Sequence, residues 1–180
     1  NVNNIRARIQ EVYDTNVIVK RPVNAGVSNA LGAEFSFNNK PTKWWVSDLG
    51  VNLFYYEITG EIPGSSLDQQ TFTYRGRWSN SFVLPKDWKV QFISNYVADV
   101  VSVQGMDKGY VSFDLAVKKD FNDGKVATTL QIRNLIASER RETWVDTPTL
   151  YSYRMATPRW MVAALSVSIR LNNFDNSDKI

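Results

Sequence analysis

Residues 45–55 read WVSDLGVNLFY, and their side chains alternate in character with a period of two. One parity is apolar and the other is polar: Leu49, Val51, Leu53 and Tyr55 against Asp48, Gly50 and Asn52. Successive side chains of a β-strand point to opposite faces of its sheet. The stretch therefore predicts a strand with one apolar face and one polar face.

The same alternation recurs along the whole chain. It predicts seven further strands, at Ile5–Tyr13, Val27–Phe37, Thr71–Phe82, Trp88–Val100, Val111–Phe121, Lys125–Ile136 and Trp160–Leu171. No segment shows helical spacing of comparable quality. We expect an all-β chain of about eight antiparallel strands, forming one unit over residues 1–180.

The predicted connections alternate in length. Short turns are expected at Asn38–Pro41, Pro85–Asp87 and Asn122–Gly124, which carry turn-forming residues. The turn at Pro85–Asp87 should pair Arg77 with Asn95, and the turn at Asn122–Gly124 should bring Asp114 close to Arg133. The longer connections are expected at Asp14–Gly26, Glu61–Gln70, Ser102–Lys108 and Ala137–Arg159. Short turns at one end and long loops at the other are typical of transmembrane barrels, in which the short turns are periplasmic.

Aromatic side chains gather near both ends of the predicted strands. Those near the short turns are Trp44, Trp45, Phe82, Trp88, Phe121 and Phe174, and those near the long loops are Tyr55, Tyr56, Phe72, Tyr74, Tyr96, Tyr110 and Trp160. The ten residue-to-residue steps from Trp45 to Tyr55, at about 3.3 Å each and tilted by about 40°, span roughly 25 Å. That is the height of the apolar band between the two aromatic girdles of an outer-membrane barrel.

Composition excludes several other classes. The chain has 180 residues with a net charge of +3, and it contains neither cysteine nor histidine. Its basic residues do not cluster, so we expect no nucleic-acid partner. Without thiols or imidazoles we expect no enzyme activity, no metal and no cofactor. A carboxylate pair, Glu142 with Glu139 or with Asp146, would need a cleft to act in hydrolysis.

Two other architectures suit the alternation. One is a soluble β-sandwich or ligand-binding barrel, whose aromatic residues would form an interior core. The other is a complete eight-stranded outer-membrane barrel with a structural or adhesive role. Detergent dependence would separate the first from a membrane protein, and the length of the reading frame would identify the second.

Several runs of residues resemble the late strands of TonB-dependent outer-membrane receptors. Pro22–Gly26 followed by Leu31–Phe35 resembles a strand of the pattern N-x-G…G-x-E, and an aromatic-led strand, Trp44–Ile58, follows it as in that family. Gln131–Ile136 is similar to the penultimate strand, with Ile136 in place of the usual Phe, and Leu165–Leu171 to the closing strand. The resemblance covers nearly the whole chain.

The resemblance implies a role in transport in the bacterial outer membrane. This chain would be the C-terminal part of an energy-coupled receptor that imports a siderophore, a glycan or a similar solute. Its partners would be membrane lipid, the remaining strands of a barrel of about 22, the plug domain, a TonB-type energy-transducing protein and a surface lipoprotein. We therefore expect a segment of a larger protein that does not transport by itself.

Two sets of residues are candidates for contact with a solute. The first faces the lumen by parity: Glu34, Asp48, Arg75, Arg77, Asp99, Asp114, Lys118, Arg133 and Arg170. These side chains either guide a solute or only hydrate the lumen and pair across strands. The second set lies in the long connection before the last strand: Arg140, Arg141, Trp144, Tyr151 and Tyr153. Arginine and aromatic residues dominate recognition surfaces, although a loop of this kind can also be solvated or act as a lid.

Overall fold

A computed structural model describes residues 2–3, 6–14, 17–24, 26–62, 65–157 and 160–171. Its described residues form strands, turns and connections, with no helix that could cross a membrane. The strands are β1 Val2–Asn3, β2 Arg6–Asp14, β3 Val17–Asn24, β4 Val27–Thr42, β5 Trp45–Ile62, β6 Ser65–Leu84, β7 Trp88–Val97, β8 Val100–Ser102, β9 Gly105–Asp107, β10 Tyr110–Phe121, β11 Val126–Arg133, β12 Arg141–Thr147, β13 Leu150–Ala156 and β14 Val162–Ile169.

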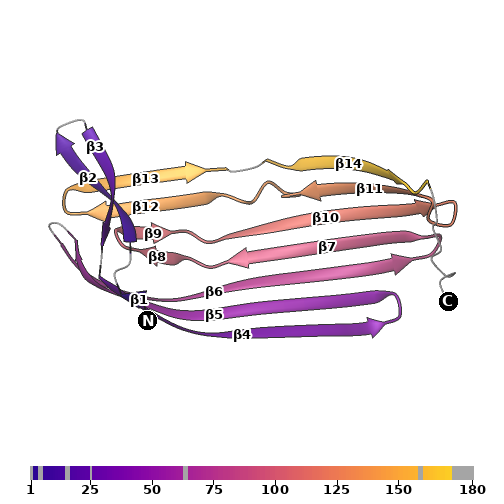
Figure 1. Ribbon diagram of the computed structural model, residues 1–180, viewed down its shortest axis with the longest axis horizontal. Coiled ribbons are helices and arrows are strands. Elements are labelled where there is room, and N and C mark those ends of the chain that lie inside the picture. The colour runs from indigo at the N-terminus through magenta and orange to yellow at the C-terminus, as the bar shows by residue number, and fades with distance from the viewer. Residues whose placement is uncertain are drawn as a thin grey trace, which may run out of the picture.

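One antiparallel sheet carries the architecture, in the order β1-β4-β5-β6-β7-β10-β11-β14 (Figure 1). Chain neighbours are also sheet neighbours from β4 to β7, which confirms the predicted all-β antiparallel arrangement. The sheet is open: β4 forms one side with the short β1, and β14 forms the other. Among the described residues, β14 pairs with β11 alone.

The register keeps apolar and polar side chains on separate faces. One cross-strand row contains Phe82, Val90, Val117, Leu130 and Leu165. Another contains Gly50, Arg77, Asn95 and Ser112. The predicted pairing of Arg77 with Asn95 is therefore confirmed, and the polar residues keep to one face across the strands that define both rows.

The apolar face is not covered by a second layer in the described part of the chain. Leu165 is 69% exposed, Val167 is 59% exposed and Ile169 is 61% exposed. The buried apolar residues there are few: Ile9, Ile58, Ala98 and Val145. A soluble sandwich would bury such a face against another sheet. An apolar face in contact with lipid needs no such layer.

Two groups of packed aromatic rings mark the ends of this face. At the short turns, the ring centroids of Trp44 and Trp45 both lie near that of Phe82, at 6.1 and 6.0 Å. Toward the other end, the Tyr74 ring lies 6.4 Å from Phe72 and 5.5 Å from Tyr96. Phe174 lies outside the described residues. The predicted separation of aromatic side chains to the two ends holds for these residues.

Two predicted girdle residues belong instead to the polar side. Tyr56 packs against the buried pair Ile9 and Ile58, and Tyr110 lines a hollow on the polar face. Their positions along the strands were right, but their parity is opposite to that of Tyr55 and Tyr96. An amphipathic ring can pack against either face of a sheet, so the residue type alone did not settle its side.

A smaller four-stranded sheet, β13-β12-β9-β8, prolongs the large sheet at the end opposite the short turns (Figure 1). Its strands continue β14, β11, β10 and β7 in that order. The prediction that Ser102–Lys108 and Ala137–Arg159 form loops is therefore wrong in part, because both contain paired strands. Likewise β5 and β6 extend to Ile62 and from Ser65 into the predicted loop Glu61–Gln70.

The strand predicted to be the first membrane strand belongs instead to a separate hairpin. β2 pairs with β3, and this pair crosses over the smaller sheet in Figure 1 rather than joining the edge of the large one. The expectations of a membrane strand at Ile5–Tyr13 and a loop at Asp14–Gly26 were therefore wrong. Ile9 is 1% exposed and packs against Ile58. The apolar side chain of Ile9 is therefore buried against β5 and not against lipid, which explains why apolar and polar residues alternate around it.

The first short turn also lies further along the chain than predicted. β4 continues through Asn38–Pro41, and the turn is at Lys43 and Trp44. The register shifts between Asn39 and Thr42, which marks a bulge around Pro41. A proline, which has no N–H to donate, is tolerated at a bulge and near a sheet edge. The turns at Pro85–Asp87 and Asn122–Gly124 are where the sequence predicts them.

Gly109 provides a test of the bend between the two sheets. A Cβ atom added there would lie 2.2 Å from the Val97 carbonyl oxygen, while nothing lies within 4 Å of a Cβ added at Gly50. Gly109→Ala should lower the free energy of unfolding by about 1–3 kcal/mol, because the clash is with backbone that cannot move aside. Gly50→Ala should be neutral or slightly stabilising. Urea unfolding in lipid vesicles measures both, and equal effects would contradict this close approach.

Candidate functional site

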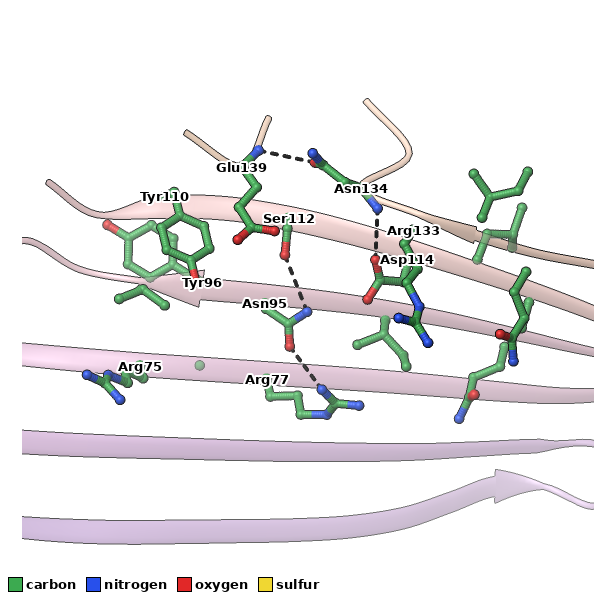
Figure 2. Close-up of a pocket in the computed structure, with 18 of the residues that line it drawn as sticks. Arg75, Arg77, Asn95, Tyr96, Tyr110, Ser112, Asp114, Arg133, Asn134 and Glu139 are labelled. Atoms are coloured by element: carbon green, nitrogen blue, oxygen red, sulfur yellow. Dashed lines mark hydrogen bonds between the residues drawn. The ribbon is translucent and has the colours of Figure 1, made fainter. Parts of the chain in front are cut away.

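The polar face of the large sheet is hollowed beneath the junction with the smaller sheet. The hollow has a volume of about 630 Å³, and β5, β6, β7, β10 and β11 contribute to its wall. Figure 2 shows Arg75 and Arg77 on one side of it and Asp114, Arg133 and Glu139 on the other. Alternation along five strands, rather than any local motif, brings these side chains together.

A row of hydrogen bonds forms the floor of the hollow. Arg77 Nη1 donates to Asn95 Oδ1 at 3.1 Å, and Asn95 Nδ2 donates to Ser112 Oγ at 3.4 Å (Figure 2). These residues stand opposite one another in the register of β6, β7 and β10. A one-residue slip of any strand would move its member of the row to the apolar face. The floor is therefore fixed by the register of the sheet.

The roof is the connection that leaves β11. Asn134 is 2% exposed and has a φ of 51°, a left-handed conformation that asparagine tolerates well. Its backbone N–H donates to Asp114 Oδ1 at 2.9 Å, and its Oδ1 accepts from Glu139 N at 3.1 Å. Ser138 Oγ donates to the Val111 carbonyl oxygen at 2.7 Å. These bonds hold the connection against β10 and turn Glu139 toward the hollow.

The predicted lumen-facing residues divide into separate groups. Arg75, Arg77, Asp114 and Arg133 all line the hollow. Asp114 and Arg133 were expected to be neighbours, and Figure 2 shows them side by side. Each is the residue next to a member of the cross-strand pair Leu115 and Ile132. The remaining residues take the positions described next.

Lys118 and Arg170 line a second, smaller hollow near the short turns. There Asp120 accepts from Lys118 Nζ at 3.0 Å and from Lys89 Nζ at 3.1 Å. Arg170 lies just beyond the end of β14. At this end of the sheet the lumen-facing charges pair across strands, which is one of the two roles expected for them.

Three acidic residues of the predicted set lie away from both hollows. Asp48 accepts a hydrogen bond from Asn38 Nδ2 across β4 and β5. Glu34 stands opposite Asn52 on β5. Asp99 lies outside the strands, in the connection between β7 and β8, where its Oδ1 accepts from Gly109 N at 2.6 Å. Its role is to hold the bend between the two sheets.

The second candidate set lies on a hairpin, not on an open loop. Trp144 and Tyr153 face one another across β12 and β13, with ring centroids 5.3 Å apart, and Lys108 Nζ lies 5.7 Å from the centre of the Trp144 ring. Tyr151 shares the parity of Tyr153 and is 69% exposed. The three aromatic residues therefore share one face of the hairpin.

One of the two arginines of that set, Arg141, is not part of the aromatic face. Arg141 has the opposite parity to Trp144, and its Nη2 atom bonds Glu139 Oε1 at 3.1 Å. Arg140 precedes β12. The charge of Arg140 opposes the rise in the pKa of Tyr153 that partial burial causes, so Arg140 lies close to the aromatic face. Recognition that also includes Arg141 would have to involve both faces of the hairpin.

The carboxylates of the same region are engaged by other groups. Glu139 binds Arg141, and Glu142 Oε2 accepts from the Tyr153 hydroxyl at 3.1 Å. Partial burial, and next the hydrogen bond to Glu142, raise the pKa of Tyr153 above its usual range. The described residues contain no group of three or more side chains suited to holding a metal ion. Glu139 and Glu142 each have a hydrogen-bonding partner.

Several residues of the hollow escaped sequence reasoning. From the sequence alone, Glu139 is only a possible acid and Tyr110 only part of a girdle. The motif Gln131–Ile136, which resembles a receptor strand, contains Asn134. The pattern gives no sign that the Asn134 side chain accepts a hydrogen bond from Glu139 N and so holds the connection over the hollow. Residues 17 to 20 positions apart in the chain meet here, so these contacts depend on the register of the strands.

The β2–β3 hairpin is hydrogen-bonded to the side chain of Gln104, which lies in the connection between β8 and β9. Gln104 Oε1 accepts from Gln10 N at 2.7 Å, and Gln104 Nε2 donates to Gln10 O at 3.1 Å. Gln104→Ala should accelerate hydrogen exchange of the Gln10 amide several-fold, since a net hydrogen bond is worth about 1 kcal/mol. Gln104→Glu keeps the acceptor and should protect that amide. Unchanged exchange in the alanine variant would show that other contacts hold the hairpin.

A family model described as outer membrane protein beta-barrel family matches residues 1–168. No curated protein matches the chain, and no solved structure matches it.

Proposed function

Because the chain belongs to the outer membrane protein beta-barrel family, we propose that it forms part of the barrel of an energy-coupled receptor that imports a solute. Membership of that family places it in the bacterial outer membrane, where its apolar face contacts lipid. The solute would be a siderophore, a glycan or a similar nutrient. The proposal assigns the chain no chemical reaction.

The observation that carries the proposal is the hollow on the polar face. A side-chain-filled barrel of eight strands leaves no room for a cavity of about 630 Å³ that is lined by three arginines. A wide, water-filled lumen accommodates both the cavity and its charges. The polar face is therefore suited to a passage for solutes.

The open sheet supports membership of a larger barrel. In lipid, the unpaired N–H and C=O groups along β4 and β14 would each cost several kcal/mol. The two strands are not bonded to one another in the sheet. We propose that further strands of the same protein pair with both, and that a plug domain, a TonB-type protein and a surface lipoprotein complete the system.

The test is uptake by the bacterium that carries the intact gene. Accumulation of radiolabelled ferric siderophores and of labelled oligosaccharides is compared in the wild type, in a deletion strain and in a strain without the TonB-type protein. At least one solute should accumulate poorly in both mutants and recover when the gene is restored. Normal uptake of every solute in the deletion strain, or uptake that persists without the TonB-type protein, would contradict the proposal.

Normal uptake of every solute in the deletion strain would favour the alternative of a structural or adhesive barrel. The same strains then show it directly, because adhesion or envelope integrity would fall in the deletion strain while uptake stays normal. The hollow would in that case be only a hydrated part of the lumen wall.

A further inference from the structure

We infer that the hollow binds a solute through at least two oxyanion groups, which its arginines recognise. This inference rests on the proposed function and specifies the chemistry of the solute. Three guanidinium groups line the hollow, those of Arg75, Arg77 and Arg133. All three residues are exposed on the polar face, so their charged ends are open to a ligand.

None of these three arginines has an acidic partner in the described part of the chain. The ion pairs found there within 4.0 Å join Arg21 to Glu11, Lys89 and Lys118 to Asp120, and Arg141 to Glu139. Arg77 donates to the neutral amide oxygen of Asn95. A guanidinium group has five N–H donors, so most of the donors in the hollow are left for water or a solute.

The acidic residues that face the hollow are already engaged. Glu139 bonds Arg141, which comes from outside the wall, and Asp114 accepts the backbone N–H of Asn134. Glu34 belongs to the same cross-strand row as Arg75, but Asn52 stands between them. Inside the hollow, the three arginines therefore face only two carboxylates, those of Asp114 and Glu139. The charge of Glu139 is already neutralised by Arg141.

At the short-turn end of the polar face, two cationic side chains are paired with one carboxylate. Near the short turns Lys89 and Lys118 both pair with Asp120. A lumen that needed only hydration could pair its charges in this way throughout. Unpaired arginines over the hollow, beside paired lysines elsewhere on the same face, point to a local requirement for cations.

Arginine also specifies the chemistry of the ligand. Its planar fork matches the two oxygens of a carboxylate, phosphate or sulfate group, whereas lysine acts as a point charge. Arg75 and Arg77 are two residues apart on β6, about 7 Å along the strand, and Arg133 lies three strands away, about 14 Å across the sheet. One oxyanion cannot satisfy all three. A solute with two or more of them can bridge the hollow, across which Figure 2 shows Arg77 and Arg133 extending.

The test uses the full-length protein, purified in detergent, and calorimetric titration. The probes are citrate for carboxylate groups, inorganic pyrophosphate for phosphate groups, and glycerol as a neutral control, at about 150 mM salt to screen diffuse attraction. At least one anion should bind at a concentration below about 10 mM, and glycerol should not. Binding of citrate alone, or of pyrophosphate alone, would identify the kind of oxyanion.

Variants separate a site from a general positive potential. Arg77→Gln and Arg133→Gln should each weaken the binding of that anion about tenfold or more, because a charge-assisted hydrogen bond is lost. Lys118→Gln removes the same charge from the same face, but from the paired group, and should leave the affinity unchanged. Arg77→Lys should recover only part of the affinity. Heat-modified mobility on gels verifies that each variant is folded.

Two results would overturn the inference. In one, neither anion binds the wild type. In the other, Lys118→Gln weakens binding as much as the arginine variants do. Failure of the proposed import function looks different, because binding to the purified protein needs no energy source. If the purified protein binds the anion but the cells show no energy-coupled uptake, this inference stands and the import proposal fails. If the cells show energy-coupled uptake but the purified protein binds no anion, the import proposal stands and this inference fails.

Discussion

Replacing Leu115 with arginine is expected to lower the free energy of unfolding of the intact barrel by about 2–4 kcal/mol. Leu115 lies on the apolar face near the middle of β10, in the row that also contains Phe92 and Ile132. A guanidinium group at this depth would lose its water without gaining a partner. Equilibrium unfolding in phospholipid vesicles measures the cost.

Ala116→Arg is the matched control. Ala116 is the next residue of β10, at almost the same depth, and it lines the hollow on the polar face. Its arginine would reach water, so the cost there should be less than about 1 kcal/mol. Similar costs at the two positions would show that the two faces meet the same environment, and the membrane orientation of the sheet would then be wrong.

The orientation of the faces could be predicted because it depends on a local pattern. Alternation in Trp45–Tyr55 fixes which side chains share a face, and the short turn after Leu84 fixes how β6 meets β7. Together they predicted that Arg77 would stand opposite Asn95, which the register confirms. Both arguments use only chain neighbours, so they need no knowledge of the rest of the fold.

The fate of the N-terminal residues could not be predicted in this way. Alternation around Ile9 is as good as in a membrane strand, but the partner that buries it, Ile58, is 49 residues away. Similarly, the proline and asparagines of Asn38–Pro41 signal a turn, while the position of β4 near the edge of the sheet allows a bulge there instead. In both cases a tertiary contact overrides a local preference.

Parity predicted which charged residues share the polar face, and it did not predict how they are grouped there. Parity correctly assigned Arg75, Arg77 and Lys118 to the polar face. It could not tell that Asp120 pairs with Lys118 while no carboxylate reaches Arg77, because that difference depends on which strands lie side by side and how far each side chain extends. The division into a paired and an unpaired group appears only in three dimensions.

Asn134→Ala is expected to destabilise the intact protein by about 2–4 kcal/mol, although the residue is small and contributes no apolar core. Two costs add. Alanine at a φ of 51° is strained by about 1 kcal/mol or more, and the Glu139 N–H loses its acceptor in a partly buried connection, at about 1–3 kcal/mol. Urea unfolding in vesicles measures the sum.

Asn134→Gly separates the two costs, because glycine adopts a left-handed φ without strain but also lacks the amide oxygen. The glycine variant should recover about 1 kcal/mol relative to alanine and remain less stable than the wild type. Both variants should also weaken anion binding in the hollow, since the same hydrogen bond positions Glu139 to pair with Arg141, and a displaced Glu139 carboxylate would compete with the anion for the arginines of the hollow. If alanine and glycine were equally tolerated and left binding unchanged, the connection would be held by Ser138 and the backbone alone, and the asparagine of this strand would have no part in building the roof.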